Sequence, residues 1–198
     1  YNLNVDFNFT VASIIFCPNE PVDFMFIDNT CVSNFDFSSI QSMVWDFGDG
    51  TQYVNNNPSY ANVNPAHAYT APGTYQISLT LIDAQGCSDT EVKSITINPL
   101  PTPAFTVATG CYGTPVSITN SSTGGGGSAI TAATWNMGDG NTLNTINPGN
   151  YTYSAANNYN VTLQVTDANS CKASLSTPIT IRGDVIPTLS ATAANCPA

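Results

Sequence analysis

The sequence predicts an all-β fold built from tandem β-sandwiches. Hydrophobic and polar residues alternate over 3–11, 22–26 and 75–81, a pattern that is typical of half-buried strands. Gly, Pro and Asn separate such segments, and none of them has a convincing helical period. Several blocks also recur in the same order along the chain. Seven or so short strands in about 90 residues describe a β-sandwich, which is here repeated.

The composition favours packed domains that carry little charge. Hydrophobic residues make up 42% of the chain and charged residues only 8%, with a net charge of −10. Three basic residues cannot neutralise a phosphate backbone, which argues against a nucleic-acid partner. No apolar run approaches the ~20 residues of a spanning helix, so membrane insertion is not expected. Most acidic residues lie in residues 1–100, as ordinary solubility charge or as part of a cation site.

The internal repeat is the strongest feature of the sequence. Trp-Asp-Phe-Gly-Asp-Gly at 45–50 recurs as Trp-Asn-Met-Gly-Asp-Gly at 135–140, and the strand at 75–84 recurs at 159–168. Chance does not align several features in order, so the chain contains a tandem duplication. Trp45 and Trp135 are the expected core anchors.

The repeat and its Pro-rich joints divide the chain into modules. We expect sandwich 1 over residues 1–98, sandwich 2 over 99–185, and a linker with the start of a third repeat over 186–198. Pro-rich joints are short and semi-rigid, so the modules are expected to form a rod.

The ordered motifs resemble the PKD (polycystic kidney disease) domain. The order is Trp-Asp-Phe-Gly-Asp-Gly at 45–50, His-Ala-Tyr at 67–69 and Pro-Gly-Thr-Tyr at 72–75, followed by a strand ending in Asp83. The resemblance covers nearly the whole chain as two copies, similar to repeats of large secreted Bacteroidetes-type surface proteins. It implies an immunoglobulin-like sandwich that is not catalytic and acts as a spacer, adhesion or carbohydrate-contacting module.

The resemblance also assigns a structural motif to each copy. In the second copy Asn136 replaces the Asp, Met137 replaces the Phe and Tyr151 replaces the His, so a function of Asp46 or His67 cannot extend to both copies. The motif residues are Trp45, Asp46, Gly48, Asp49, Gly50, His67, Tyr69, Gly73 and Tyr75, then Trp135, Gly138, Asp139, Gly140, Tyr153 and Tyr159.

The six cysteines predict disulfides and hence export. None lies in a CxxC motif, and one His cannot build a His/Cys zinc site. Paired cysteines around each module look like those of the PKD repeats, and the expected bridges are Cys17–Cys87 and Cys111–Cys171. Cys196 is expected to pair beyond this chain. Cys31 is left over, as a buried free thiol or as a link to a neighbouring chain.

Other candidate sites have a structural and a functional interpretation. Asp46 and Asp49 are turn residues or, alternatively, ligands of a calcium ion; no other cofactor is expected. His67 is the single His and no G-x-S-x-G motif is present, so we do not expect an enzyme. The four Gly from 124 to 127 predict a flexible surface loop. The N-glycosylation pattern occurs at Asn8, Asn120, Asn150 and Asn160.

These features predict an extracellular, cell-surface structural or adhesion segment, such as a disulfide-stapled stalk or filament subunit. Its partners would be neighbouring repeats of the same chain or identical subunits, and the strand Tyr1–Val11 could pair with a preceding subunit. One alternative is a carbohydrate- or protein-binding module that stacks sugars on Tyr53, Tyr60 and Tyr112. Another is an accessory domain of a larger secreted hydrolase.

Overall fold

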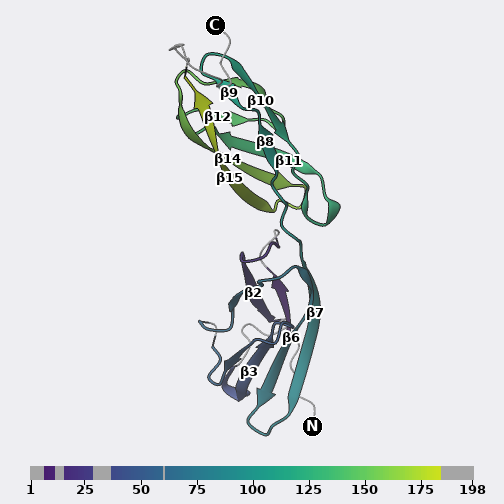
Figure 1. Ribbon diagram of the computed structural model, residues 1–198. Coiled ribbons are helices and arrows are strands. Elements are labelled where there is room, and N and C mark those ends of the chain that lie inside the picture. The colour runs from purple at the N-terminus through teal and green to yellow at the C-terminus, as the bar shows by residue number, and fades with distance from the viewer. Residues whose placement is uncertain (1–6, 12–15, 29–36, 60, 184–198) are drawn as a thin grey trace, which may run out of the picture. The chain divides into compact units, whose positions relative to one another are not determined.

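The computed structural model describes residues 7–11, 16–28, 37–59 and 61–183. The chain divides into two compact units, Tyr1–Pro99 and Leu100–Ala198, each with two β-sheets (Figure 1). The third repeat predicted for 186–198 lies outside the described residues. In the part that is described, no helix is long and apolar enough to cross a membrane.

Unit 1 is a β-sandwich, as the sequence predicts. One sheet has the strand order β1-β2-β5 and the other has the order β4-β3-β6-β7. A 3₁₀ turn at Phe37–Ser39 precedes β3. The strands are β1 (Phe7–Val11), β2 (Pro21–Asp28), β3 (Ile40–Asp46), β4 (Gln52–Asn55), β5 (Ala66–Ala68), β6 (Gly73–Asp83) and β7 (Ser88–Ile97). Of the strand expected from residue 1, residues 7–11 are described and form β1.

Among the described residues, unit 2 has the same two-sheet architecture as unit 1 and one further short strand, β9. Its sheets have the orders β13-β10-β8 and β12-β11-β14-β15-β9, and β9 joins β15 in parallel. A 3₁₀ turn spans Gly125–Gly127. The strands are β8 (Phe105–Val107), β9 (Gly110–Cys111), β10 (Pro115–Asn120), β11 (Ile130–Asn136), β12 (Thr142–Asn144), β13 (Gly149–Thr152), β14 (Asn157–Asp167) and β15 (Lys172–Arg182).

The duplication is preserved in strand register. Trp45 on β3 lies opposite Leu79 on β6, and Trp135 on β11 lies opposite Leu163 on β14. Both pairings contain a register irregularity near the start of the first strand, between Ile40 and Ser42 and between residues 130 and 132. A slip of one residue would turn the apolar side chains of a strand to solvent. The same alternation of apolar and polar residues in the two units therefore specifies the same register in both.

Each unit has its own hydrophobic core around its Trp. Trp45 and Trp135 are fully buried. The Trp45 ring packs against Phe24 at a centroid distance of 5.7 Å, and Trp135 meets Phe105 edge-on at 5.3 Å. Each indole N–H donates to a loop carbonyl, that of Val63 at 3.2 Å or that of Thr145 at 2.9 Å. The Trp therefore contributes both apolar area and a satisfied polar group.

Candidate functional site

The Gly-Asp-Gly turn that follows β3 and β11 requires glycine for two reasons. Gly48 has φ +78° and Gly138 has φ +81°, in the left-handed region that disfavours other residues. A Cβ atom on Gly138 would also lie 2.8 Å from the carbonyl oxygen of Asn160 on β14. On Gly48 it would collide with the backbone of Gln76 on β6. The turn is therefore pressed against the neighbouring long strand in both units.

In unit 1 this turn engages every carboxylate oxygen of its two aspartates. Asp46 accepts a bond from the Gly48 N–H at 2.8 Å and one from the Gln52 side-chain amide at 2.7 Å. Asp49 accepts from the N–H of Thr51 at 3.0 Å and from its hydroxyl at 2.6 Å. The second Asp49 oxygen lies 2.7 Å from His67 Nε2.

These bonds lower the pKa of both carboxyls. For Asp46, the bonds from Gln52 and Gly48 hold the pKa below its ordinary value. Burial by itself would raise the pKa of Asp49, but the bonds from Thr51 and His67 outweigh burial and lower it. The ionised form of each aspartate is thus the one that the turn stabilises.

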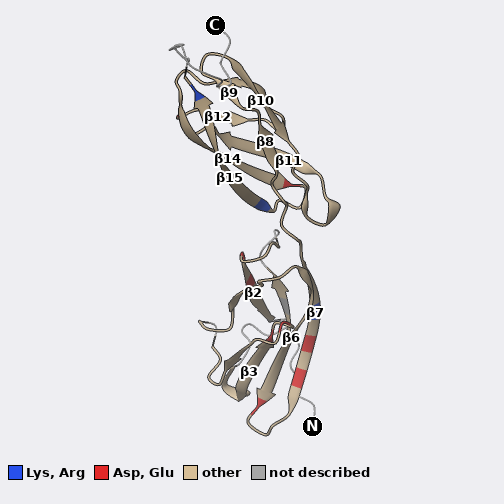
Figure 2. Ribbon diagram, viewed as in Figure 1, with Lys and Arg blue, Asp and Glu red and all other residues tan. Residues whose placement is uncertain are grey.

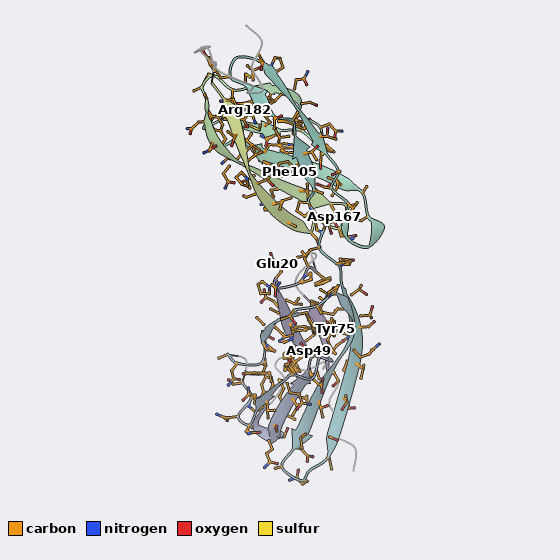
Figure 3. The ribbon with its side chains drawn as sticks, viewed as in Figure 1. Glu20, Asp49, Tyr75, Phe105, Asp167 and Arg182 are labelled. Carbon is orange, nitrogen blue, oxygen red and sulfur yellow. The ribbon has the colours of Figure 1, made fainter. Side chains whose placement is uncertain are left out.

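The His67 ring holds the Asp49 turn against the core. It stacks on Phe47 with a centroid distance of 4.2 Å and an interplanar angle of 8°, and it meets Tyr69 edge-on at 4.7 Å. Its side chain is 16% exposed and that of Asp49 is 20% exposed. Figure 3 labels Asp49 and Tyr75, which belongs to the same aromatic cluster through Tyr69. We call the Asp49–His67 pair the clasp of unit 1.

Unit 2 builds the same clasp from different chemistry. The Tyr151 hydroxyl donates to Asp139 at 2.7 Å and accepts from the side-chain amide of Asn141 at 2.8 Å. Burial and the bond to Asp139 raise the pKa of Tyr151 to about 12. Burial would raise the pKa of Asp139, but bonds from Tyr151 and Asn141 lower it. The Asn136 side chain is uncharged, yet its oxygen accepts a hydrogen bond from the Gly138 N–H at 2.9 Å, as Asp46 does from the Gly48 N–H.

A buried tyrosine ties the turn to the core in both units. The Tyr69 hydroxyl donates to the Phe47 carbonyl at 2.9 Å, and the Tyr153 hydroxyl donates to the Met137 carbonyl at 3.1 Å. Both rings are fully buried, and burial raises the pKa of both phenols. Tyr75 on β6 packs against Tyr69 in a tilted arrangement at 4.3 Å, and Tyr159 on β14 stacks on Tyr153 at 4.4 Å.

This geometry is not that of a hydrolytic triad. In a triad the carboxylate and the nucleophilic hydroxyl contact different nitrogens of the His ring. Here Asp49 lies 2.7 Å and the Thr51 hydroxyl 3.4 Å from the same atom, His67 Nε2, and the hydroxyl donates to Asp49. Within the described residues, no three His, Cys, Asp or Glu side chains form a cluster that could hold a metal ion.

The structure corrects the predicted bridge Cys17–Cys87. Cys87 is a free thiol, whereas Cys17 is in a disulfide. The Phe16 carbonyl accepts from the Asn98 N–H at 2.8 Å, which places Cys17 beside the last residue of β7, while Cys87 precedes its first residue. Strands rise about 3.3 Å per residue, so some 30 Å separates the two ends. Disulfides need Cα atoms within about 7 Å.

The predicted bridge Cys111–Cys171 is wrong for the same reason. Cys111 lies opposite Arg182 at the end of β15, and Cys171 directly precedes the first residue of that strand. Both are in disulfides, but β15 is too long for a bond between them. Cys31 and Cys196, which were predicted to be unpaired or intermolecular, lie outside the described residues.

The remaining predicted residues do not converge. The Tyr53 hydroxyl donates to the Asn62 carbonyl at 3.0 Å, Tyr112 is 38% exposed, and Tyr60 lies outside the described residues. The Asn120 amide donates to the Ile146 carbonyl at 2.8 Å, a bond that a glycan would disturb. Asn150 and Asn160 are exposed on β13 and β14, and Asn8 lies on β1.

The polyglycine segment is more ordered than the sequence suggests. Gly125 is buried, and its N–H donates to the buried Asp167 carboxylate at 3.1 Å. The same carboxylate accepts from the Ser128 hydroxyl at 2.9 Å and from the Cys171 N–H at 3.0 Å. Figure 3 labels Asp167 at the end of β14. The recurrence of Asp-Ala at 83–84 and 167–168 was the available signal for this role.

An open groove of about 580 Å³ runs along β8 and β15 in unit 2. Phe105 is its one aromatic lining residue, and that ring packs edge-on against Trp135. Arg182 also lines the groove, and both residues are labelled in Figure 3. The groove therefore offers no flat exposed ring on which a sugar could stack.

Comparisons with known proteins agree with this architecture. The family model described as "PKD domain" matches residues 27–99 and 97–182. A microbial collagenase of Vibrio alginolyticus is 33% identical over 61 residues, which is 31% of this chain and 7% of that protein. Collagenase ColA of Bacillus cereus is 32% identical over 83 residues, 42% of this chain and 8% of that protein. The chain thus spans under a tenth of the length of these relatives.

The comparison with solved structures also finds PKD domains of two Vibrio proteins. The PKD1 domain of Vibrio anguillarum Epp has 23% identity and a TM-score of 0.40, and covers 43% of this chain and 98% of its own. The PKD1 domain of the Vibrio cholerae metalloprotease PrtV has 26% identity and a TM-score of 0.31, and covers 47% and 93%. Since the family model matches most of the sequence in two consecutive copies, the chain belongs to the PKD domain family as a tandem of two domains.

Proposed function

We propose that this chain is a non-catalytic extracellular segment whose two sandwiches, arranged in series, space or hold other parts of a secreted protein. The observation that carries the proposal is the clasp. In both units the polar groups of the family motif bond to one another and to their own backbone. A motif whose polar groups bond within the sandwich in this way stabilises the fold.

The cysteines support an extracellular location. Cys17, Cys111 and Cys171 are in disulfides, which persist in oxidising compartments and are rare in the cytosol. Charged residues make up only 8% of the chain, and most of the acidic ones lie in residues 1–100, among them Asp89 and Glu91 on β7 (Figure 2).

Stretching single molecules between their termini tests the spacer role directly. Two sandwiches in series should give two separate unfolding events, each resisted by the strand pairing of one unit. Light scattering and negative-stain microscopy of the unreduced protein then distinguish a monomeric stalk from a filament subunit. In the filament case, deletion of Tyr1 to Val5 should abolish assembly. A force–extension curve without two separate unfolding peaks, like that of an unstructured chain, would refute the proposal.

A second candidate is supported by the relatives named as collagenases, at 33% and 32% identity. In this candidate the chain is an accessory part of a larger secreted hydrolase, and it binds the substrate that the catalytic part cleaves. Cosedimentation with fibrillar collagen and with insoluble polysaccharides, with and without calcium, tests it. Saturable binding would favour this candidate, whereas the spacer role predicts that the protein stays in the supernatant with every fibre.

A further inference from the structure

The hairpin turn between β6 and β7 has the same backbone as its counterpart between β14 and β15. The Cys87 N–H donates to the Asp83 carboxylate at 2.8 Å, and the Asp83 N–H donates to the Cys87 carbonyl at 2.9 Å. The corresponding bonds between Cys171 and Asp167 both measure 3.0 Å. One module can therefore serve as the comparison structure for the other at this turn.

The two cysteines differ in their chemical state. Cys171 is fully buried and in a disulfide, whereas Cys87 is partly exposed and carries a free thiol. Among the described cysteines, Cys87 alone is free. The same turn therefore holds a disulfide-bonded cysteine in unit 2 and a free cysteine in unit 1.

The surroundings of Cys87 leave room for a partner. Ala84 and Gln85 in the turn are exposed, and a Cβ atom on Gly86 would find nothing within 4 Å. Cys17 cannot be that partner, because it lies at the far end of β7 and is already bonded. The tip of the hairpin is thus open to another protein surface.

We propose that Cys87 is a junction thiol, which forms an intermolecular disulfide with a cysteine of a second copy of this chain. Each of the two thiols loses one proton and one electron as the S–S bond forms. A disulfide oxidant such as oxidised glutathione accepts both electrons and both protons and becomes two thiols. This inference goes beyond a spacer role, since it concerns a covalent joint and does not depend on what the spacer holds apart.

The test uses the whole chain with its existing disulfides, incubated with a mixture of reduced and oxidised glutathione at increasing protein concentration. Non-reducing electrophoresis should show a covalent dimer whose yield rises with concentration. Peptide mass spectrometry should find the Cys87 peptide in the cross-link. Cys87→Ser should abolish the dimer and leave the fold intact, because the Cys87 thiol is free and the bonds of this residue to Asp83 come from its backbone.

A matched control separates a shaped site from an ordinary surface thiol. The double variant Cys87→Ser with Ser88→Cys moves the thiol by one residue to an exposed strand position that faces the other side of the sheet. Its dimer yield should be several-fold lower than that of the unmodified chain. Equal yields, a Cys87 thiol that stays free, or a cross-link from Cys87 to Cys31 within one chain would each overturn the proposal.

Discussion

The clasp of unit 1 and the clasp of unit 2 keep one geometry with two chemistries. Asp49 meets an imidazole and Asp139 meets a phenol, at the same heavy-atom distance of 2.7 Å. Both partners come from a strand of the smaller sheet, His67 from β5 and Tyr151 from β13. The difference shows that this position requires a flat ring with a hydrogen-bond donor on its edge. A particular charge is not required, which argues for a structural role.

The largest expected effect tests whether the units are energetically separate. Trp45→Ala should destabilise unit 1 by about 3–5 kcal/mol, because a fully buried ring leaves a cavity and an unpaired loop carbonyl. Trp135→Ala should do the same to unit 2. Calorimetry should show that each variant lowers only its own transition. A variant that lowers both transitions equally would show that the units unfold as one.

The stability cost of replacing a turn glycine by alanine should differ more between the two glycines of one turn than between equivalent glycines of the two units. Gly140→Ala meets open space at φ +95° and should cost about 1 kcal/mol from the left-handed backbone alone. Gly138→Ala has a similar φ and also collides with the Asn160 backbone, so it should cost clearly more. Gly50→Ala and Gly48→Ala form the matched pair in unit 1. Urea unfolding measures all four variants, and equal costs within a unit would contradict the close approach to β6 and β14.

Acid should separate the two units. The folded pKa values of Asp46, Asp49 and Asp139 are lowered, so each carboxyl contributes stability above its unfolded pKa of about 3.9 that is lost as the pH falls through the folded pKa. Among the described residues, two carboxyls of unit 1 and one of unit 2 have a lowered pKa, because unit 2 has the non-titrating Asn136 in place of Asp46. Below pH 4 the melting temperature of unit 1 should therefore fall more than that of unit 2, as thermal unfolding would show.

Asp46→Asn is the control for this acid effect. It copies Asn136, whose side-chain oxygen keeps the bond to the turn glycine at 2.9 Å. The variant should narrow the difference in acid sensitivity between the units. A difference that is unchanged in this variant would assign the sensitivity to groups outside the turn.

Alkali should destabilise unit 2 more than unit 1, the reverse of the effect expected in acid. The pKa of Tyr151 is raised from 10.0 to about 12, so its contribution is fully present below pH 10 and is lost as the pH rises through 12. The pKa values of Tyr69 in unit 1 and Tyr153 in unit 2 are both raised, so these two tyrosines do not distinguish the units. Unit 2 should therefore weaken more than unit 1 between pH 10 and 12. His67→Tyr should transfer this alkaline sensitivity to unit 1, as circular dichroism against pH would show.

Calcium should have the smallest effect. Every carboxylate oxygen of Asp46 and Asp49 already accepts a hydrogen bond, so an ion would have to replace bonds that the fold supplies. The melting temperature of unit 1 should stay the same with calcium or with a chelator. A rise confined to unit 1 would restore the calcium interpretation of this turn, since Asn136 weakens the site in unit 2.

The sequence by itself determined the fold class, the duplication and the core anchors of this protein. Those features depend on local periodicity and on recurring blocks, and the alternation at 75–81 lies within β6 with Ile77 and Leu79 buried. The turn glycines and the family followed from short motifs whose order can be read directly. Such information is local, so one sequence contains it without any knowledge of long-range contacts.

Only the tertiary structure decided which distant residues meet. Cysteines at matching positions of the two repeats suggested one bridge around each module, but the long strands β7 and β15 hold those cysteines at opposite ends. The pairing of Asp49 with His67, and the bonds between Asp167 and the polyglycine turn, likewise depend on how separate segments lie across the sandwich. Sequence spacing measures contour length along the chain, whereas bonds depend on distance in space, which strand length and sheet order set.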